Sequence, residues 1–324
     1  LASPIPLQTP APVTPFDERD PARLPGTDVR IVSLNTLFGG FLDPGLDGQR
    51  IARLLDSVDP DIICFQEQLA PRDFTIPDRL AEIDPREDGR AWNVIEAGDT
   101  TTCSPYPLTL LYESSDHHAV LVDLGAGDDI VVFNTHPRCC GFVGSSSDFS
   151  RIADMQEKAD QIAQIRAGNT PGVDPEAPIV VIGDWNLVGS NTPLDILTDP
   201  AGPALADWPI QNLAKRSITT WRSLNGLSFS PGRLDLVADD PTRLLRRNGY
   251  VLNTRDLSDD LLASMGLLPD DSRASDHLLL VADYGFFPAG DLTDDGRVDI
   301  EDLYATDDAT IRDFLRRREA IEIR

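Results

Sequence analysis

The stretch PIVVIGDWNLVGSN, residues 178–191, decides how the chain is interpreted. Its apolar run, residues 179–183, predicts a buried strand. That strand ends in Asp184 and Asn186, which place a carboxylate and a carboxamide two residues apart at the edge of a sheet. Layered α/β proteins gather functional groups at strand ends, so this edge is the first candidate for a site.

The rest of the pattern predicts an α/β fold of the α+β type. Strand, helix and strand follow one another over residues 28–38, 48–60 and 61–68, which indicates a layered unit. Further strands are expected at 91–97, 108–113, 118–124, 129–136, 233–239 and 277–287, and a long amphipathic helix at 150–168. Because hairpin strands alternate with helices, we expect two sheets flanked by helices rather than one parallel sheet.

Composition restricts the class of protein. The formal net charge is −26 and the sequence pI is about 4.3, so the surface repels nucleic acids and anionic membranes at long range. A bound divalent cation can reverse that sign locally, so a nucleic-acid substrate stays open. No apolar run reaches the length of a membrane span. The Pro-rich residues 1–26 are expected to form a leader or linker, and we expect a secreted, periplasmic or cell-surface protein.

The four cysteines suggest one disulfide. Cys64 lies in an apolar run and is expected to be an inert buried thiol. Cys103 is expected in a loop, where a disulfide to Cys139 or Cys140 is plausible in an oxidising compartment. A soft-metal site is the rival interpretation, which the lack of a C-x-x-C spacing disfavours.

Polar side chains recur where predicted strands meet loops. They are Asn35, Glu67, His136, Asp184, Asn186, Asp235, Asp276 and His277. A hard divalent cation takes carboxylate and amide oxygens and keeps several waters. It can hold a phosphate and neutralise charge in the transition state, while a histidine backed by a carboxylate accepts a proton from water. The set therefore favours metal-assisted attack of water on a phosphodiester.

Six motifs in this order carry a resemblance: LNTLF, FQEQ, NTHP, GDWN, RLD and SDH. The chain resembles the endonuclease/exonuclease/phosphatase superfamily from about residue 28 to 284. That superfamily includes pancreatic-type deoxyribonucleases, abasic-site endonucleases, neutral sphingomyelinases and inositol-polyphosphate phosphatases. The resemblance implies a four-layer αββα sandwich with a Mg²⁺ or Mn²⁺ site at the sheet edges.

The resemblance also implies a role for each strand-end residue. The implied metal ligands are Glu67, with Asn35 beside it, and Asp276, which would lie near the metal and could join a second site. The implied catalytic residues are His136 on the phosphate and leaving group, Asp184 on the nucleophile, Asn186 on the phosphate, and His277 as base oriented by Asp235.

Two features depart from the superfamily pattern. Its S-R-[YF]-P-I segment appears as CSPYPL, with Pro105 where the basic residue is usual, so a substrate contact is expected to be missing. In the deoxyribonucleases of the superfamily, a carboxylate partners the first catalytic histidine. Its equivalent is not evident in this sequence; Glu96 and Asp99 are candidates. His117 and His118 are interpreted as an exposed strand end.

The C-terminal residues 288–324 are predicted to form a separate calcium-binding tail. DLTDDGRVDIED fits a twelve-residue calcium loop, with Gly296 at the turn. The expected Ca²⁺ ligands are Asp291, Thr293, Asp295, Arg297 through its carbonyl, Asp299 and Asp302. The loop is similar to a type I dockerin repeat, which implies a cohesin-like partner.

Together these features predict a catalytic domain at residues 27–287 in a monomeric, metal-dependent phosphodiester hydrolase. The first hypothesis is an endonuclease that cleaves DNA or RNA. The second is a sphingomyelinase, phospholipase C or inositol-phosphate phosphatase. The third is an inactive calcium-dependent binding module.

Overall fold

The computed structural model describes residues 18–68, 75–84, 89–125, 128–224 and 230–287. The predicted calcium loop, with all its expected ligands, and the first part of the Pro-rich leader lie outside the described residues. The described end of the leader contacts the domain: Arg19 donates to the carbonyl oxygens of Gly249 and Gln211, and Asn248 donates to that of Asp20.

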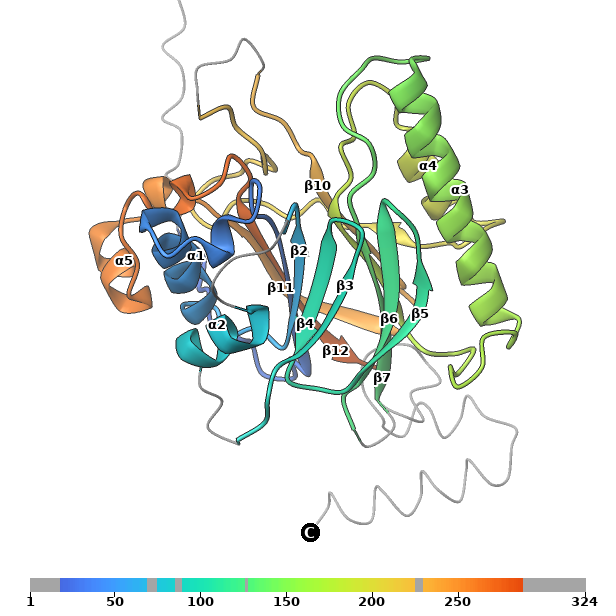
Figure 1. Ribbon diagram of the computed structural model, residues 1–324, viewed down its shortest axis with the longest axis horizontal. Helices are drawn as coiled ribbons and strands as arrows, with labels where there is room; N and C mark the ends of the chain where they lie inside the picture. The colour runs from blue at the N-terminus through green and yellow to red at the C-terminus, as the bar shows by residue number, and fades with distance from the viewer. Residues whose placement is uncertain (1–17, 69–74, 85–88, 126–127, 225–229, 288–324) are drawn as a thin grey trace, which may run out of the picture.

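Two six-stranded sheets pack face to face between two layers of helices, which confirms the predicted sandwich (Figure 1). The first sheet has the order β11 (Leu244–Leu252), β12 (Leu279–Phe286), β1 (Val29–Asn35), β2 (Ile62–Gln66), β4 (Thr100–Ser104), β3 (Asn93–Ala97). The second has the order β5 (Leu108–Glu113), β6 (His117–Asp123), β7 (Asp129–Thr135), β8 (Ile179–Asp184), β10 (Asp235–Asp239), β9 (Ala206–Asp207).

Helices cover the outer face of each sheet. The first sheet carries α1 (Leu46–Asp56), α2 (Ile76–Ile83) and α5 (Asp259–Met265), and the second carries α3 (Ser146–Arg166) and α4 (Thr192–Thr198) (Figure 1). Short 3₁₀ turns occur at Gly40–Leu42, Thr254–Asp256 and Asp271–Arg273. Among the described residues, no helix combines the length and apolar character needed to cross a bilayer.

Alternation along the central strands builds three apolar layers. In β1, Ile31 packs between the sheets, whereas Val32 faces the helices of the first sheet. In β8, Ile182 packs between the sheets, whereas Val181 faces α3. Because side chains of a strand alternate between its faces, strands buried on both sides read as continuous apolar runs.

Two parallel strand pairs bring the predicted site residues to one edge. β1 and β2 run parallel in the first sheet, with Asn35 opposite Gln66. β7 and β8 run parallel in the second sheet, with Thr135 opposite Gly183. The carboxyl ends of each pair therefore lie together, and the loops that follow carry the candidate residues.

Most predicted elements are present, and three strands were missed, of which β9 has only two residues. β4 is a run of threonines without an apolar alternation, and β11 contains RRNG in its middle. β11 pairs with β12 through an irregular register between Arg246 and Gly249, which explains the interrupted pattern.

The cysteine and histidine predictions need correction. Cys103 lies in β4 rather than in a loop, and it is buried in the layer beneath α1 and α2. Cys139 and Cys140 are exposed in the segment between β7 and α3. All four cysteines are free, so the predicted disulfide is wrong. The buried thiol predicted for Cys64 is confirmed.

His117 and His118 are fully buried in β6, not exposed. They point to opposite faces of the second sheet. His117 contacts α3 through Asp154, and His118 is hydrogen-bonded to Thr100 and Thr102 in the layer between the sheets.

Candidate active site

Asn35 joins two carboxylates at the sheet edge. Its Nδ2 donates to Glu67 Oε1 and to Asp184 Oδ2, each at 3.1 Å. Its Oδ1 accepts the backbone N–H of Leu37 at 3.0 Å, which fixes the orientation of the amide. The ends of β1, β2 and β8 are thereby held together by one side chain. The predicted ligand role of Asn35 stays a prediction.

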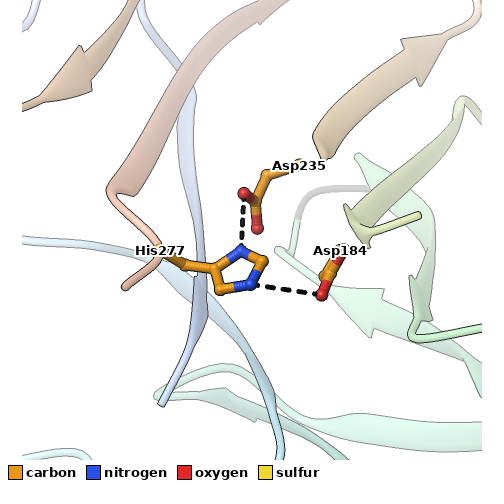
Figure 2. A group of neighbouring side chains, drawn as sticks. All are labelled: Asp184, Asp235 and His277. Atoms are coloured by element: carbon orange, nitrogen blue, oxygen red, sulfur yellow. Dashed lines mark hydrogen bonds and ion pairs between the residues drawn. The ribbon is translucent and has the colours of Figure 1, made fainter. Parts of the chain in front are cut away.

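His277 lies between two carboxylates. Its Nδ1 is 2.9 Å from Asp235 Oδ2, and its Nε2 is 3.5 Å from Asp184 Oδ2 (Figure 2). Asp235 begins β10, and His277 precedes β12, so the pair connects the two sheets. Burial lowers the pKa of His277, but the Asp235 and Asp184 carboxylates outweigh burial and raise this pKa to about 10.

Asp184 is fully buried between the two histidines of the site. Burial raises the pKa of this carboxyl, and although His277 opposes the shift, the net pKa stays above its usual value. A raised pKa makes Asp184 a stronger proton acceptor than an exposed aspartate.

His136 is the second histidine at this edge. Its Nδ1 is 2.7 Å from Asp99 Oδ2, and its Nε2 is 3.7 Å from Glu67 Oε1 and 3.5 Å from Asp184 Oδ2. Burial lowers the pKa of His136, but the hydrogen bond to Asp99 and the neighbouring carboxylates raise it overall. Asp99, rather than Glu96, is therefore the partner that the sequence left undecided.

The site loops contain most of the unusual backbone. Among the described residues, five of seven non-glycine residues with positive φ belong to these loops: Leu37, Phe38, Glu67, Cys140 and Asn186. Gly183 has φ of 145°, and a Cβ there would lie 2.2 Å from Thr135 O. The glycine of GDWN is thus required for β8 to approach β7, and backbone strain accumulates where the functional groups are aimed.

Asn186 ties the two loops of the second sheet together. Its Nδ2 donates to Pro137 O at 3.0 Å, and its backbone N–H donates to Asp184 Oδ1 at 2.9 Å. The side chain is buried among these contacts. Its predicted role on the phosphate stays a prediction.

Asp276 has a partner that the sequence did not reveal. Its Oδ2 accepts the indole N–H of Trp221 at 2.9 Å, while its Oδ1 is buried without a hydrogen-bond partner. Trp221 also forms an isolated bridge with His277. No motif marks Trp221, since 55 residues separate it from Asp276 along the chain.

The donor set fits a hard divalent cation. Glu67 is partly exposed, with 21% of its side chain accessible, so a hydrated ion can reach it. Asp184, Asp235 and His277 form a buried group with ligand atoms within 4.8 Å of one another. One oxygen each of Asp235 and Asp276 is buried without a partner, and the ion pairs of Asp184 in the described chain are both with histidines. This excess of negative charge is what a divalent cation neutralises.

The sequence match decides the family. Residues 32–277 match the Endonuclease/Exonuclease/phosphatase family. The chain belongs to that family. Its members are metal-dependent hydrolases of phosphoric esters, and they usually use divalent ions such as Mg²⁺. The matched segment contains every residue predicted for the active site, from Asn35 to His277, which is its last residue.

Solved structures with this fold are similar over most of the chain. A truncated Caenorhabditis elegans TDP2 is 19% identical, with 79% of this chain and 97% of that chain covered and a TM-score of 0.51. The human Nocturnin catalytic domain with a bound sulfate anion is 16% identical, with 82% and 96% covered and a TM-score of 0.51. D. rerio TDP2 complexed with a single-strand DNA product is 15% identical, with 79% and 98% covered and a TM-score of 0.50. No curated protein matches the chain.

Proposed function

We propose that the protein is a divalent-metal-dependent phosphodiesterase that cleaves nucleic acid by attack of water. The observation that supports this most strongly is the cluster in which Asp184 Oδ2 lies 3.5 Å from both His136 Nε2 and His277 Nε2. Two histidines, each backed by a carboxylate, face one buried carboxylate at the edge where Glu67 is accessible. The single-strand DNA product bound by D. rerio TDP2 supports nucleic acid as the substrate class.

Glu67 and, for a second ion, Asp276 would hold the cation, with Asn35 positioning the Glu67 carboxylate. A bound divalent ion would neutralise charge on the phosphoryl oxygens. His136 faces the same space with its Nε2, and its raised pKa favours the protonated ring. It therefore donates to a phosphoryl oxygen or to the leaving oxygen.

The proton of the attacking water passes to the pair formed by Asp184 and His277. We assign it to the pair rather than to His277 alone, because the pKa of about 10 leaves His277 protonated at neutral pH in the cation-free chain. Two interacting groups titrate together, and a nearby divalent cation lowers the pKa of both. Asp235 holds the His277 ring by its Nδ1, so that Nε2 faces Asp184.

Plasmid digestion tests this proposal. The purified protein is incubated with supercoiled DNA, or with RNA, and Mg²⁺ or Mn²⁺, alongside EDTA and His277→Ala controls. Nicking that disappears in both controls supports the proposal. If wild type does not nick DNA or cut RNA under any of these conditions, nucleic acid is the wrong substrate class.

A second candidate is hydrolysis of a phospholipid, which one observation favours. The loop after His136 exposes Phe142 and Val143, with 73% and 62% of their surfaces accessible. The backbone of these residues lies close to Gly189, just after the GDWN motif, so the apolar loop borders the site. The sequence alone did not reveal this cluster.

Phe142→Ser distinguishes the two candidates. A lipid enzyme would lose hydrolysis of vesicle-bound phosphodiester while retaining hydrolysis of a small soluble phosphodiester. A nuclease would show no hydrolysis of vesicles in the first place. Secretion, a monomeric state, calcium binding by the tail and a cohesin-like partner rest on the sequence and stay predictions.

A further inference from the structure

A fully buried arginine on α3 contacts both catalytic loops of the second sheet. The Arg151 guanidinium donates from one terminal nitrogen to Arg138 O and Cys140 O, each at 2.9 Å. Its other terminal nitrogen donates to Val188 O at 2.9 Å. The first two carbonyls follow His136, and the third follows the GDWN motif.

We propose that Arg151 is a positioning residue that sets the distance between His136 and Asp184; this inference rests on the proposed function. His136 and Asp184 directly follow Thr135 and Gly183, the last paired residues of β7 and β8. Beyond that pairing, their 3.5 Å separation also depends on how residues 137–141 and 186–189 are held. Asn186 forms one hydrogen bond between these loops, through Pro137 O. Arg151 on α3 donates three more, two to the first loop and one to the second.

The chemistry of this position requires a guanidinium. Arginine presents several N–H donors in a rigid planar fork, whereas lysine presents a compact ammonium. Only the fork reaches carbonyls of two loops at once. Asp148 lies 3.5 Å from the same guanidinium and accepts the backbone N–H of Gly144 at 2.8 Å. The carboxylate thus balances the buried charge and holds the far end of the first loop.

Arg30 provides a matched control. It is also buried, and it donates to Val58 O and Pro21 O as well as to both oxygens of Asp283. It lies near the start of β1, at the opposite end of the strand from Asn35. Its replacement removes a buried arginine of the same kind without touching the catalytic loops.

The experiment compares Arg151→Lys with Arg30→Lys. Amide hydrogen exchange is measured without added cation, and turnover of bis(4-nitrophenyl) phosphate is measured with Mn²⁺, per folded molecule. Arg151→Lys is expected to raise exchange in residues 137–141 and 186–189 and to lower kcat about tenfold to a hundredfold, because small misplacements of catalytic groups are costly. KM is expected to stay within about twofold, because Glu67 and the first sheet are untouched.

Arg30→Lys is expected to lower the melting temperature but to leave kcat and the exchange of both loops at wild-type values. The inference is overturned if Arg151→Lys changes neither exchange nor kcat, or if Arg30→Lys lowers kcat equally. If wild type hydrolyses no phosphodiester, the proposed function fails, while the exchange data still decide the role of Arg151.

Should Arg151→Lys not fold, Asp148→Asn takes its place. This variant keeps the three carbonyl contacts of Arg151 and weakens the hold on Gly144. Exchange is then expected to rise in residues 142–144 and to stay unchanged in residues 138–141 and 186–189, which Arg151 still contacts. Increased exchange in residues 138–141 or 186–189 of this variant would contradict the inference.

Discussion

Two histidine–carboxylate pairs in this protein have similar geometry and different surroundings. His117 Nδ1 lies 2.9 Å from Asp154 beneath α3, and His277 Nδ1 lies 2.9 Å from Asp235 at the sheet edge. On the outer face of the second sheet, Asp154 of α3 also pairs with the fully buried Lys158, so the charge of that carboxylate is balanced. At the edge, His277 faces a second carboxylate, Asp184.

The two histidine rings also differ in how many of their nitrogens have a hydrogen-bond partner. Both nitrogens of His117 have partners, because Ser114 also contacts Nδ1 and Gln161 Oε1 lies 3.1 Å from Nε2. Nε2 of His277 is only near Asp184, at a distance too long for a good hydrogen bond. A histidine–carboxylate pair therefore indicates chemistry only where negative charge is in excess and one ring nitrogen is available.

Replacing each histidine by alanine gives the largest contrast. His277→Ala is expected to lower metal-dependent phosphodiester hydrolysis by about 10²–10⁴-fold, since it removes a proton-transfer group. His117→Ala is expected to keep the turnover of each folded molecule and to lower the melting temperature. Turnover and melting temperature are measured for both variants by enzyme kinetics and thermal denaturation. Comparable turnover in the two variants would show that the surroundings do not decide which histidine–carboxylate pair takes part in catalysis.

Replacing Lys158, the buried partner of Asp154, is expected to give the next largest effect. Burial lowers the pKa of Lys158, and Asp154 is its principal partner. Lys158→Met leaves the Asp154 carboxylate buried without its cation, so the free energy of unfolding is expected to fall by about 3–5 kcal/mol. The chain offers one other lysine, Lys215, whose side chain is 59% exposed.

Lys215→Met is therefore the matched control. Its pair with Asp256 is at the surface, where such pairs contribute about 1 kcal/mol or less. Urea denaturation of both variants measures the difference. Equal losses would mean that Lys158 does not balance a buried charge.

The sequence predicted the strand ends of the site well, because each of them is local. An apolar run followed by a polar group identifies the end of a buried strand, as in GDWN and FQEQ. Parallel pairing of β1 with β2 and of β7 with β8 then brings those ends together. The fold class followed from the same alternation of strands and helices.

The partners of these groups were not predictable, because they depend on contacts between distant segments. Asp99 lies in the turn after β3 and reaches His136 across 37 residues. Arg151 looked like one of many charged positions on an amphipathic helix, although it is fully buried. His117 and His118 were misread for the same reason: a polar strand end carries no sign of α3, which covers His117, or of β4, whose threonines contact His118.

Asp99 allows a smaller test within the site itself. Asp99→Asn removes the charge that raises the pKa of His136 and keeps the shape of the side chain. Hydrolysis is expected to fall about tenfold, because a hydrogen bond to a charged partner contributes roughly 1.5 kcal/mol. Glu96→Gln, on the exposed face of β3, is the matched control and is expected to leave the rate unchanged. If both variants have the same rate, His136 does not depend on Asp99.

The last contrast concerns pH, and it separates His277 from His118. In EDTA, the pKa of His277 is raised to about 10 by Asp235 and Asp184 against the opposing effect of burial. Below the unfolded value of about 6.5 its stabilising contribution is complete, and it is lost as pH rises through 10. The free energy of unfolding lost in His277→Gln is therefore expected to shrink between pH 6.5 and 10.

His118 is expected to behave in the opposite way. Burial lowers its pKa to about 4, so the folded chain holds this ring neutral. Its contribution is present above about pH 6.5 and is lost as pH falls through 4, because the unfolded chain then binds a proton that the folded chain does not. Denaturant midpoints of wild type, His277→Gln and His118→Gln across this range measure both slopes. A penalty for His277→Gln that is constant up to pH 10 would mean that the two carboxylates do not hold the proton on His277, and the comparison between the two pairs would lose its electrostatic basis.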